Sequence, residues 1–122
     1  MIALIQRVTF GKVEVDGGCI AQIQRGVVAL VAVQSGDTTE KTQRLLTRVL
    51  NYRIFPDEAG KMNLSVMDVN GGLMLVPQFT LLADTNRGNR PSFSKNVPAE
   101  IGKQYFTQLI AYAKQQYSNI HH

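Results

Sequence analysis

The continuous aliphatic run at residues 27–33, VVALVAV, constrains the fold of this chain more than any other feature. A short apolar run of this kind is typical of a strand in the middle of a sheet whose two faces are both covered. The chain has 122 residues, a length that fits one hydrophobic core. We therefore predict a single domain over residues 1–122, built around a central sheet.

Shorter strand patterns surround this run. In residues 12–15, apolar and charged side chains alternate, which is the period of a half-exposed strand. Asp16-Gly17-Gly18 follows as a hairpin turn signal, and Asn70-Gly71-Gly72 is a second turn. Together with the central run, these patterns predict strands at residues 2–8, 12–15, 19–23, 52–55 and 73–76.

Two principal helices are predicted. Asp37-Thr38-Thr39-Glu40 resembles a capping box with Asp37 as the N-cap, and it predicts a helix that ends near Leu50. Pro98 predicts the first turn of a second helix that ends near Tyr117. The predicted apolar faces consist of Leu45, Leu46, Val49 and Leu50 in the first helix and Ile101, Tyr105, Leu109, Tyr112 and Ala113 in the second.

The basic residues of the first helix, Lys41, Arg44 and Arg48, lie on the face opposite its apolar residues. Two interpretations stay open, a solvated helix face and a contact with RNA. Because hairpins and short strands surround few helices, we expect an α+β fold with an antiparallel or mixed sheet.

Composition excludes several kinds of site. Cys19 is the only cysteine, so the chain holds no internal disulfide and no zinc site built from cysteines. The only histidines are His121 and His122, and no phosphate-binding, dinucleotide-binding or metalloprotease motif is present. We therefore expect no metal and no cofactor. No apolar run reaches the length of a membrane span, and we expect a cytoplasmic protein without a membrane partner.

The candidate site follows the predicted strand at residues 73–76. Pro77 ends this strand, and Gln78, Phe79 and Thr80 come directly after it. A polar loop with Arg87, Arg90 and Lys95 follows. Gln78 to Thr80 are also ordinary strand residues, so a purely structural role stays open. Without a catalytic histidine or metal, such a site must use positioning and hydrogen-bond donors, which suits hydrolysis of an activated ester.

Segments along nearly the whole chain resemble the D-aminoacyl-tRNA deacylases, also called D-tyrosyl-tRNA deacylases. The matching segments are MIALIQRV at residues 1–8, NYRIF at 51–55, KMNL at 61–64, QFTL at 78–81, ADT at 83–85 and RPSFSK at 90–95. The resemblance implies a barrel-like form of the mixed sheet and a cytoplasmic homodimer. It also implies an enzyme that hydrolyses the ester between a D-amino acid, or glycine, and the 3′-terminal adenosine of tRNA, a quality-control step in translation.

The resemblance also implies roles for individual residues. The family's Ser-Gln-x-Thr motif maps onto residues 77–80, with Pro77 in place of the serine, and suggests Gln78, Phe79 and Thr80 as catalytic residues. A mechanism assisted by the ribose 2′-hydroxyl of the tRNA fits a site without histidine. The residues expected to bind tRNA are Arg87, Arg90, Lys95 and Lys61, and those expected to support the site are Arg7 and Pro77.

Family members usually continue past the second helix into a last strand and an Asn-x-Gly-Pro-x-Thr segment that enters the partner subunit's site. The sequence contains no such segment. A second hypothesis is therefore an inactive or weakened homologue that keeps the fold and binds the acceptor end of tRNA. A basic globular dimer without an RNA role is a third.

Overall fold

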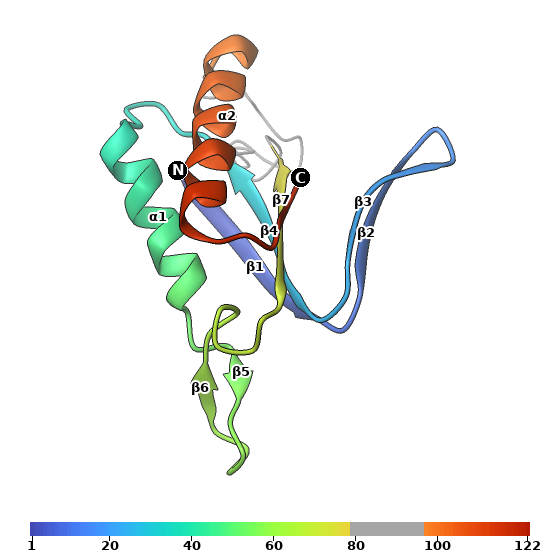
Figure 1. Cartoon of the computed structure of the whole chain (residues 1–122). Helices are drawn as coiled ribbons and strands as arrows, with labels where there is room; N and C mark the ends of the chain where they lie inside the picture. The colour runs from blue at the N-terminus through green and yellow to red at the C-terminus, as the bar shows by residue number, and fades with distance from the viewer. Residues whose placement is uncertain (79–96) are drawn as a thin grey trace, which may run out of the picture.

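The computed structural model spans the chain, and its structure is described for residues 1–78 and 97–122. A four-stranded mixed sheet has the order β1-β4-β7-β8, and helices α1 and α2 pack against each other on one of its faces (Figure 1). The sheet strands are β1 (Ile2–Val8), β4 (Gly26–Ala32), β7 (Gly72–Pro77) and β8 (Ile120–His121). The remaining elements are the hairpin strands β2 (Gly11–Val15) and β3 (Gly18–Ile23), the short pair β5 (Phe55–Pro56) and β6 (Met62–Leu64), and the helices α1 (Thr39–Asn51) and α2 (Ala99–Gln116).

The predicted aliphatic strand is the central one. β4 runs antiparallel to β1 and parallel to β7, so the prediction of a mixed sheet is confirmed. Val27, Ala29 and Val31 of β4 are buried in the core beneath the helices. Within the described residues, β1 and β8 form the two edges of this four-stranded sheet.

The N-cap of α1 is Thr38, so the prediction that Asp37 caps this helix is wrong. The Thr38 hydroxyl oxygen accepts a hydrogen bond from the Lys41 N–H at 3.2 Å. Asp37 is engaged elsewhere, since its carboxylate accepts from the Gln34 N–H at 2.8 Å and pairs with the Met1 ammonium. As predicted, Leu46, Val49 and Leu50 of α1 are buried, whereas Lys41, Arg44 and Arg48 are exposed.

The predicted strand at residues 52–55 is mostly wrong. Helix α1 extends to Asn51, and Tyr52 is its C-cap, with its N–H donating to the Val49 carbonyl at 3.4 Å. Only Phe55 and Pro56 form a strand. The ring of Phe55 is fully buried, and the guanidinium carbon of Arg25 lies 5.2 Å from its centroid.

Helix α2 begins at Ala99, one residue later than predicted, with Pro98 as its N-cap, and it ends at Gln116. Its buried residues are Leu109, Ile110 and Ala113. The prediction that Ile101 belongs to the apolar stripe is wrong, because Ile101 is 41% exposed.

Strand β8 follows α2 and was not predicted. It pairs in parallel with β7 through Ile120 and His121. His121 therefore lies in the sheet, where its Nε2 is 2.7 Å from the Asn119 side-chain oxygen.

The turn at residues 65–71 fixes the start of β7. The Ser65 N–H donates to the Asp68 carboxylate at 2.8 Å. This hydrogen bond is the main cause, and the hydrogen bond with the Ser65 side chain the second cause, of a pKa of Asp68 below its usual value. The Tyr117 hydroxyl donates to the Gly71 carbonyl at 2.6 Å, and burial raises the pKa of Tyr117, which keeps the donor protonated. These bonds hold the chain in place where it enters the strand that leads to the candidate site.

Candidate functional site

The candidate site begins where β7 ends. Pro77 is the last residue of β7 and pairs with Val31 of β4. The next residue, Gln78, donates its backbone N–H to the Val31 carbonyl at 2.8 Å. Pro77 has no N–H and is exposed, which suits the end of a strand. The ladder therefore holds Gln78 at a defined place where the chain leaves the sheet.

A hollow of about 520 Å³ lies beside Gln78, between the end of β4 and the first turns of α2. Its walls are mainly apolar and include Val31, Val97 and Phe106. Of the described residues that line it, Lys103 is the only charged one. The hollow can hold an apolar or aromatic group next to a polar amide and a cation.

The sequence interpretation missed this hollow. Its lining comes from β4, from the end of β7 and from α2, which are far apart in the sequence. The sequence holds one signal that could have indicated this hollow, the pair of small residues Ala99 and Gly102. These residues lie about one helical turn apart, on the same side of α2 as Phe106.

Several predicted site residues lie outside the described part of the chain. They are Phe79, Thr80, Arg87, Arg90 and Lys95. Of the proposed 77–80 motif, the structure therefore describes Pro77 and Gln78.

Arg7 lies toward the other end of the sheet. It pairs with Val27, whereas Ala3 pairs with Val31, the partner of Pro77. These positions are four residues apart on β1, or about 13 Å. The Arg7 guanidinium donates to the Ile54 carbonyl at 2.9 Å and contacts the Met62 sulfur at 3.3 Å. Within one chain, Arg7 thus links β1 to the segment that forms β5 and β6.

Lys61 lies in the turn between β5 and β6, at the opposite end of the molecule from the end of β7 (Figure 1). Its backbone N–H donates to the Asp57 carboxylate at 3.0 Å, and its side chain is exposed. Within one chain, the structure does not bring Lys61 or Arg7 together with Gln78.

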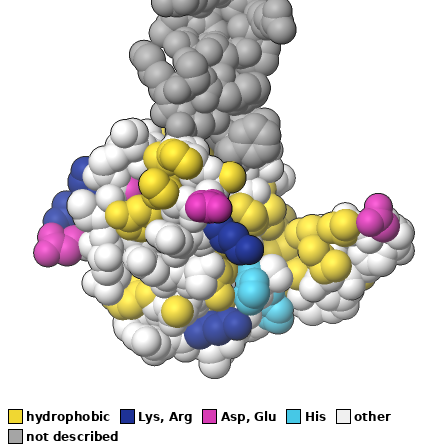
Figure 2. All heavy atoms as spheres, turned by 90° about the horizontal axis from the view of Figure 1, so that it is seen from above, with side chains coloured by type: hydrophobic (Ala, Val, Ile, Leu, Met, Phe, Trp, Pro, Cys, Tyr) yellow, Lys and Arg dark blue, Asp and Glu magenta, His cyan; other side chains and the backbone are white. Residues whose placement is uncertain are grey.

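The charged side chains do not gather into one patch on the face shown in Figure 2. Lys and Arg side chains appear there at separate places, and an apolar band leads toward the projecting β2-β3 hairpin. Among the described residues, no three His, Cys, Asp or Glu side chains come close enough to hold a metal ion. Neither helix in the described ranges is apolar enough over a sufficient length to cross a membrane.

Comparison with known proteins gives one consistent family. Residues 4–122 match the family model described as D-Tyr-tRNA(Tyr) deacylase. A D-aminoacyl-tRNA deacylase of Nitrosococcus oceani is 53% identical over 118 residues, which cover 97% of this chain and 76% of the relative. A D-aminoacyl-tRNA deacylase of Xanthomonas campestris pv. campestris is 51% identical, and the match covers 97% of this chain and 81% of that relative.

A solved structure shows the same fold. The structure titled c-Myc DNA Unwinding Element Binding Protein superposes with a TM-score of 0.91 at 33% identity, and the match covers 98% of this chain and 81% of that one.

Proposed function

This chain belongs to the D-Tyr-tRNA(Tyr) deacylase family, and we infer that it is a D-aminoacyl-tRNA deacylase, an enzyme that hydrolyses the ester bond between a D-amino acid and tRNA. The observation that carries this conclusion is the match over residues 4–122, together with 53% identity to a relative of that name. The shared fold supports it, with a TM-score of 0.91 to a solved structure.

We place the reaction at the end of β7. Gln78 is held there by its hydrogen bond to Val31, and the adjoining hollow is large enough for an aminoacyl side chain. In this proposal Gln78 orients the ester, and the backbone at Phe79 and Thr80 contributes to the catalytic site. Lys103, at the same hollow, provides positive charge for the phosphate of the terminal nucleotide.

The chemistry that we propose uses groups of the substrate. Water attacks the ester carbonyl carbon, the bond to the ribose oxygen breaks, and that oxygen takes up a proton. The neighbouring ribose 2′-hydroxyl assists the proton transfer, while N–H donors of the enzyme stabilise the charge that develops on the carbonyl oxygen. An ester needs less assistance to its leaving group than an amide, so this arrangement suffices without a histidine base.

We further propose that the enzyme acts as a cytoplasmic homodimer, with glycyl-tRNA as a second substrate. The face of the sheet that α1 and α2 leave uncovered supports dimerisation. Leu4 of β1 pairs with Leu30 of β4, and Leu30 pairs with Val76 of β7. The three side chains form an apolar row on this face. Leu4 is 55% exposed, so the row offers apolar surface for a second copy to bury.

Arg87, Arg90, Lys95 and Lys61 remain the residues proposed to bind the phosphates of tRNA. Arg7 and Pro77 remain those proposed to support the site. The net charge of +4 is consistent with a phosphate-rich substrate.

The proposal is tested by incubating the folded protein with D-tyrosyl-tRNA and measuring the tyrosine released. Hydrolysis well above the spontaneous rate is expected. Binding of tRNA without hydrolysis would instead support the alternative, an inactive homologue that keeps the fold and binds the acceptor end.

Thr80→Ala separates the two roles that a threonine can play in this reaction. If the substrate's own hydroxyl assists, we expect kcat to fall by no more than about 100-fold, whereas removal of a true nucleophile costs about 10⁶-fold. Thr47→Ala is the matched control, because Thr47 is exposed on α1 and its hydroxyl bonds only to the Gln43 carbonyl among the described groups. Complete loss of activity in a folded Thr80→Ala protein would contradict the substrate-assisted mechanism.

A further inference from the structure

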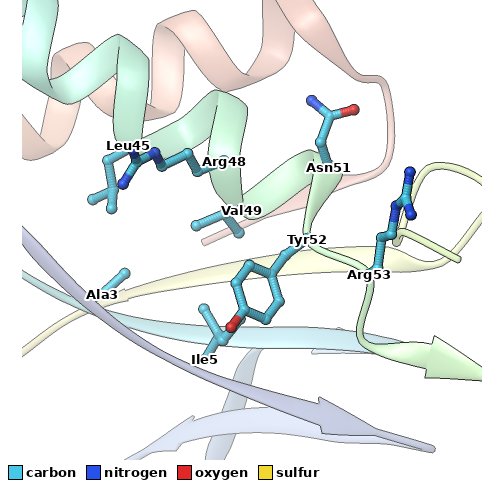
Figure 3. Close-up of a pocket in the computed structure, with 8 residues that line it drawn as sticks. All are labelled: Ala3, Ile5, Leu45, Arg48, Val49, Asn51, Tyr52 and Arg53. Carbon is cyan, nitrogen blue, oxygen red and sulfur yellow. The ribbon is translucent and has the colours of Figure 1, made fainter. Parts of the chain in front are cut away.

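A second hollow lies between the edge strand β1 and the C-terminal half of α1. Its volume is about 580 Å³, and Figure 3 shows the residues that line it. Ala3 and Ile5 of β1 form an apolar floor, and Val49 of α1 forms part of the wall. The Tyr52 ring lies beside Ile5, although 57% of the Tyr52 surface stays exposed to solvent. The hollow thus offers a flat apolar surface with an accessible aromatic ring.

Two arginines border this hollow. Arg48 and Arg53 lie on opposite sides of Tyr52 in Figure 3, and both are exposed. None of the described lining residues is acidic. Neither Arg48 nor Arg53 forms an ion pair within the described residues, and the charge of Arg53 helps to lower the pKa of Asp68. The guanidinium groups therefore remain available to bind an anion.

The combination of groups favours one class of ligand. An accessible aromatic ring stacks on a nucleobase of any identity, and arginine binds phosphate with a bidentate geometry. A purely apolar ligand would leave the arginines unused, and an inorganic anion would leave Tyr52 and the apolar floor unused. A nucleotide uses all of these groups, because it joins a flat base to a phosphate.

The register of the sheet places this hollow near the proposed catalytic site. Ala3, on its floor, pairs with Val31 of β4, and Val31 pairs with Pro77 at the end of β7. Two strand spacings, or about 10 Å, separate the Ala3 end of the hollow from Pro77, and Tyr52 lies beside Ile5, about 7 Å further along β1. A stacked strand covers the combined distance of about 12 Å in about four nucleotides, at roughly 3.4 Å per nucleotide.

We propose that the hollow between β1 and α1 binds a nucleotide of the tRNA substrate that precedes its reacting 3′ end. The base stacks on Tyr52 over Ala3 and Ile5, and Arg48 and Arg53 bind the adjoining phosphates. This inference rests on the proposed function, since it assigns a second binding site to the same substrate. It also gives a role to Arg48 on the exposed face of α1.

The test measures the dissociation constant of uncharged tRNA for Arg48→Ala, Tyr52→Ala, Tyr52→Phe and Arg44→Ala. We expect about tenfold weaker binding for Tyr52→Ala and Arg48→Ala, and nearly unchanged binding for Tyr52→Phe, which keeps the ring. Arg44 is the matched control, since it lies one turn before Arg48 on α1 and does not line the hollow. Removing Arg48 should also reduce the slope of the logarithm of affinity against the logarithm of salt concentration by about one, the change expected for the loss of one phosphate contact.

A second measurement distinguishes this inference from the proposed function. Hydrolysis of 3′-O-D-tyrosyl-adenosine, which lacks the rest of the tRNA, should be the same in all four variants and the unaltered protein. If the binding pattern appears but no substrate is hydrolysed, the proposed function fails and the nucleotide site stands. The nucleotide site would be overturned if Arg44→Ala and Arg48→Ala weakened tRNA binding equally, or if tRNA binding were unchanged in all variants. It would also be overturned if the unaltered protein did not bind tRNA.

Discussion

Gly26→Ala is expected to destabilise the fold severely. Gly26 and Gly72 pair at the first positions of the parallel strands β4 and β7. A Cβ atom on Gly26 would lie 2.0 Å from the Gly72 carbonyl oxygen and 2.7 Å from its nitrogen. Because these are backbone atoms of the neighbouring strand, only separation of the two strands relieves the overlap. We expect a cost above about 4 kcal/mol, a large part of the stability of a domain of this size.

Circular dichroism and thermal unfolding of purified Gly26→Ala measure this effect, and Gly102→Ala is the matched control. Among the described residues, a Cβ on Gly102 of α2 would meet only Val97, at 3.6 Å, an ordinary contact. Replacing glycine by alanine inside a helix usually stabilises a protein by about 0.5–1 kcal/mol. A folded Gly26→Ala protein with unchanged melting temperature would show that β4 and β7 do not approach each other as described.

Phe55→Ala is expected to lower the free energy of unfolding by about 3–5 kcal/mol. The Phe55 side chain is 0% exposed and belongs to the same core as Leu46 of α1 and Leu73 of β7. Its removal leaves a cavity and also removes the ring over which the Arg25 guanidinium lies.

Urea denaturation measures this loss as a lower midpoint with an unchanged slope. Phe10→Ala is the control, because Phe10 is 48% exposed, and a change within about 0.5 kcal/mol is expected for it. Equal effects of the two substitutions would contradict the burial of Phe55.

The sequence predicted the strands that carry a strong pattern. The apolar run at residues 27–33 became the central strand β4, and the Asp16-Gly17-Gly18 signal became the turn between β2 and β3. Asp16 and Gly17 both have positive φ angles there, of 52° and 79°, the backbone conformation that such a turn requires.

The errors have physical causes. The expected strand at residues 52–55 was shortened because α1 extends to Asn51 and takes Tyr52 as its C-cap. Strand β8 has only two residues, too few for any periodicity, and its pairing with β7 arises from the path of the chain after α2. The N-cap was misplaced by one residue because Asp37 and Thr38 are both good caps, and long-range contacts engage Asp37.

The candidate site was predictable only in its local part. The change from strand to loop after Pro77 suggested Gln78 as a candidate from its neighbouring residues, and Gln78 directly follows the last residue of β7. The hollow beside Gln78 and the one beside Tyr52 are each built from elements distant in the sequence, so a local pattern shows at most one wall of either. Tyr52 in particular matched a strand pattern, and its position next to β1 comes from the end of α1.

We infer that this chain removes D-amino acids from tRNA. The most direct test compares the release of tyrosine from D-tyrosyl-tRNA and from L-tyrosyl-tRNA by the same preparation of folded protein. We predict rapid release from the D-ester and release near the spontaneous rate from the L-ester. Absence of any hydrolysis of the D-ester by protein shown to be folded would contradict the proposed deacylase activity.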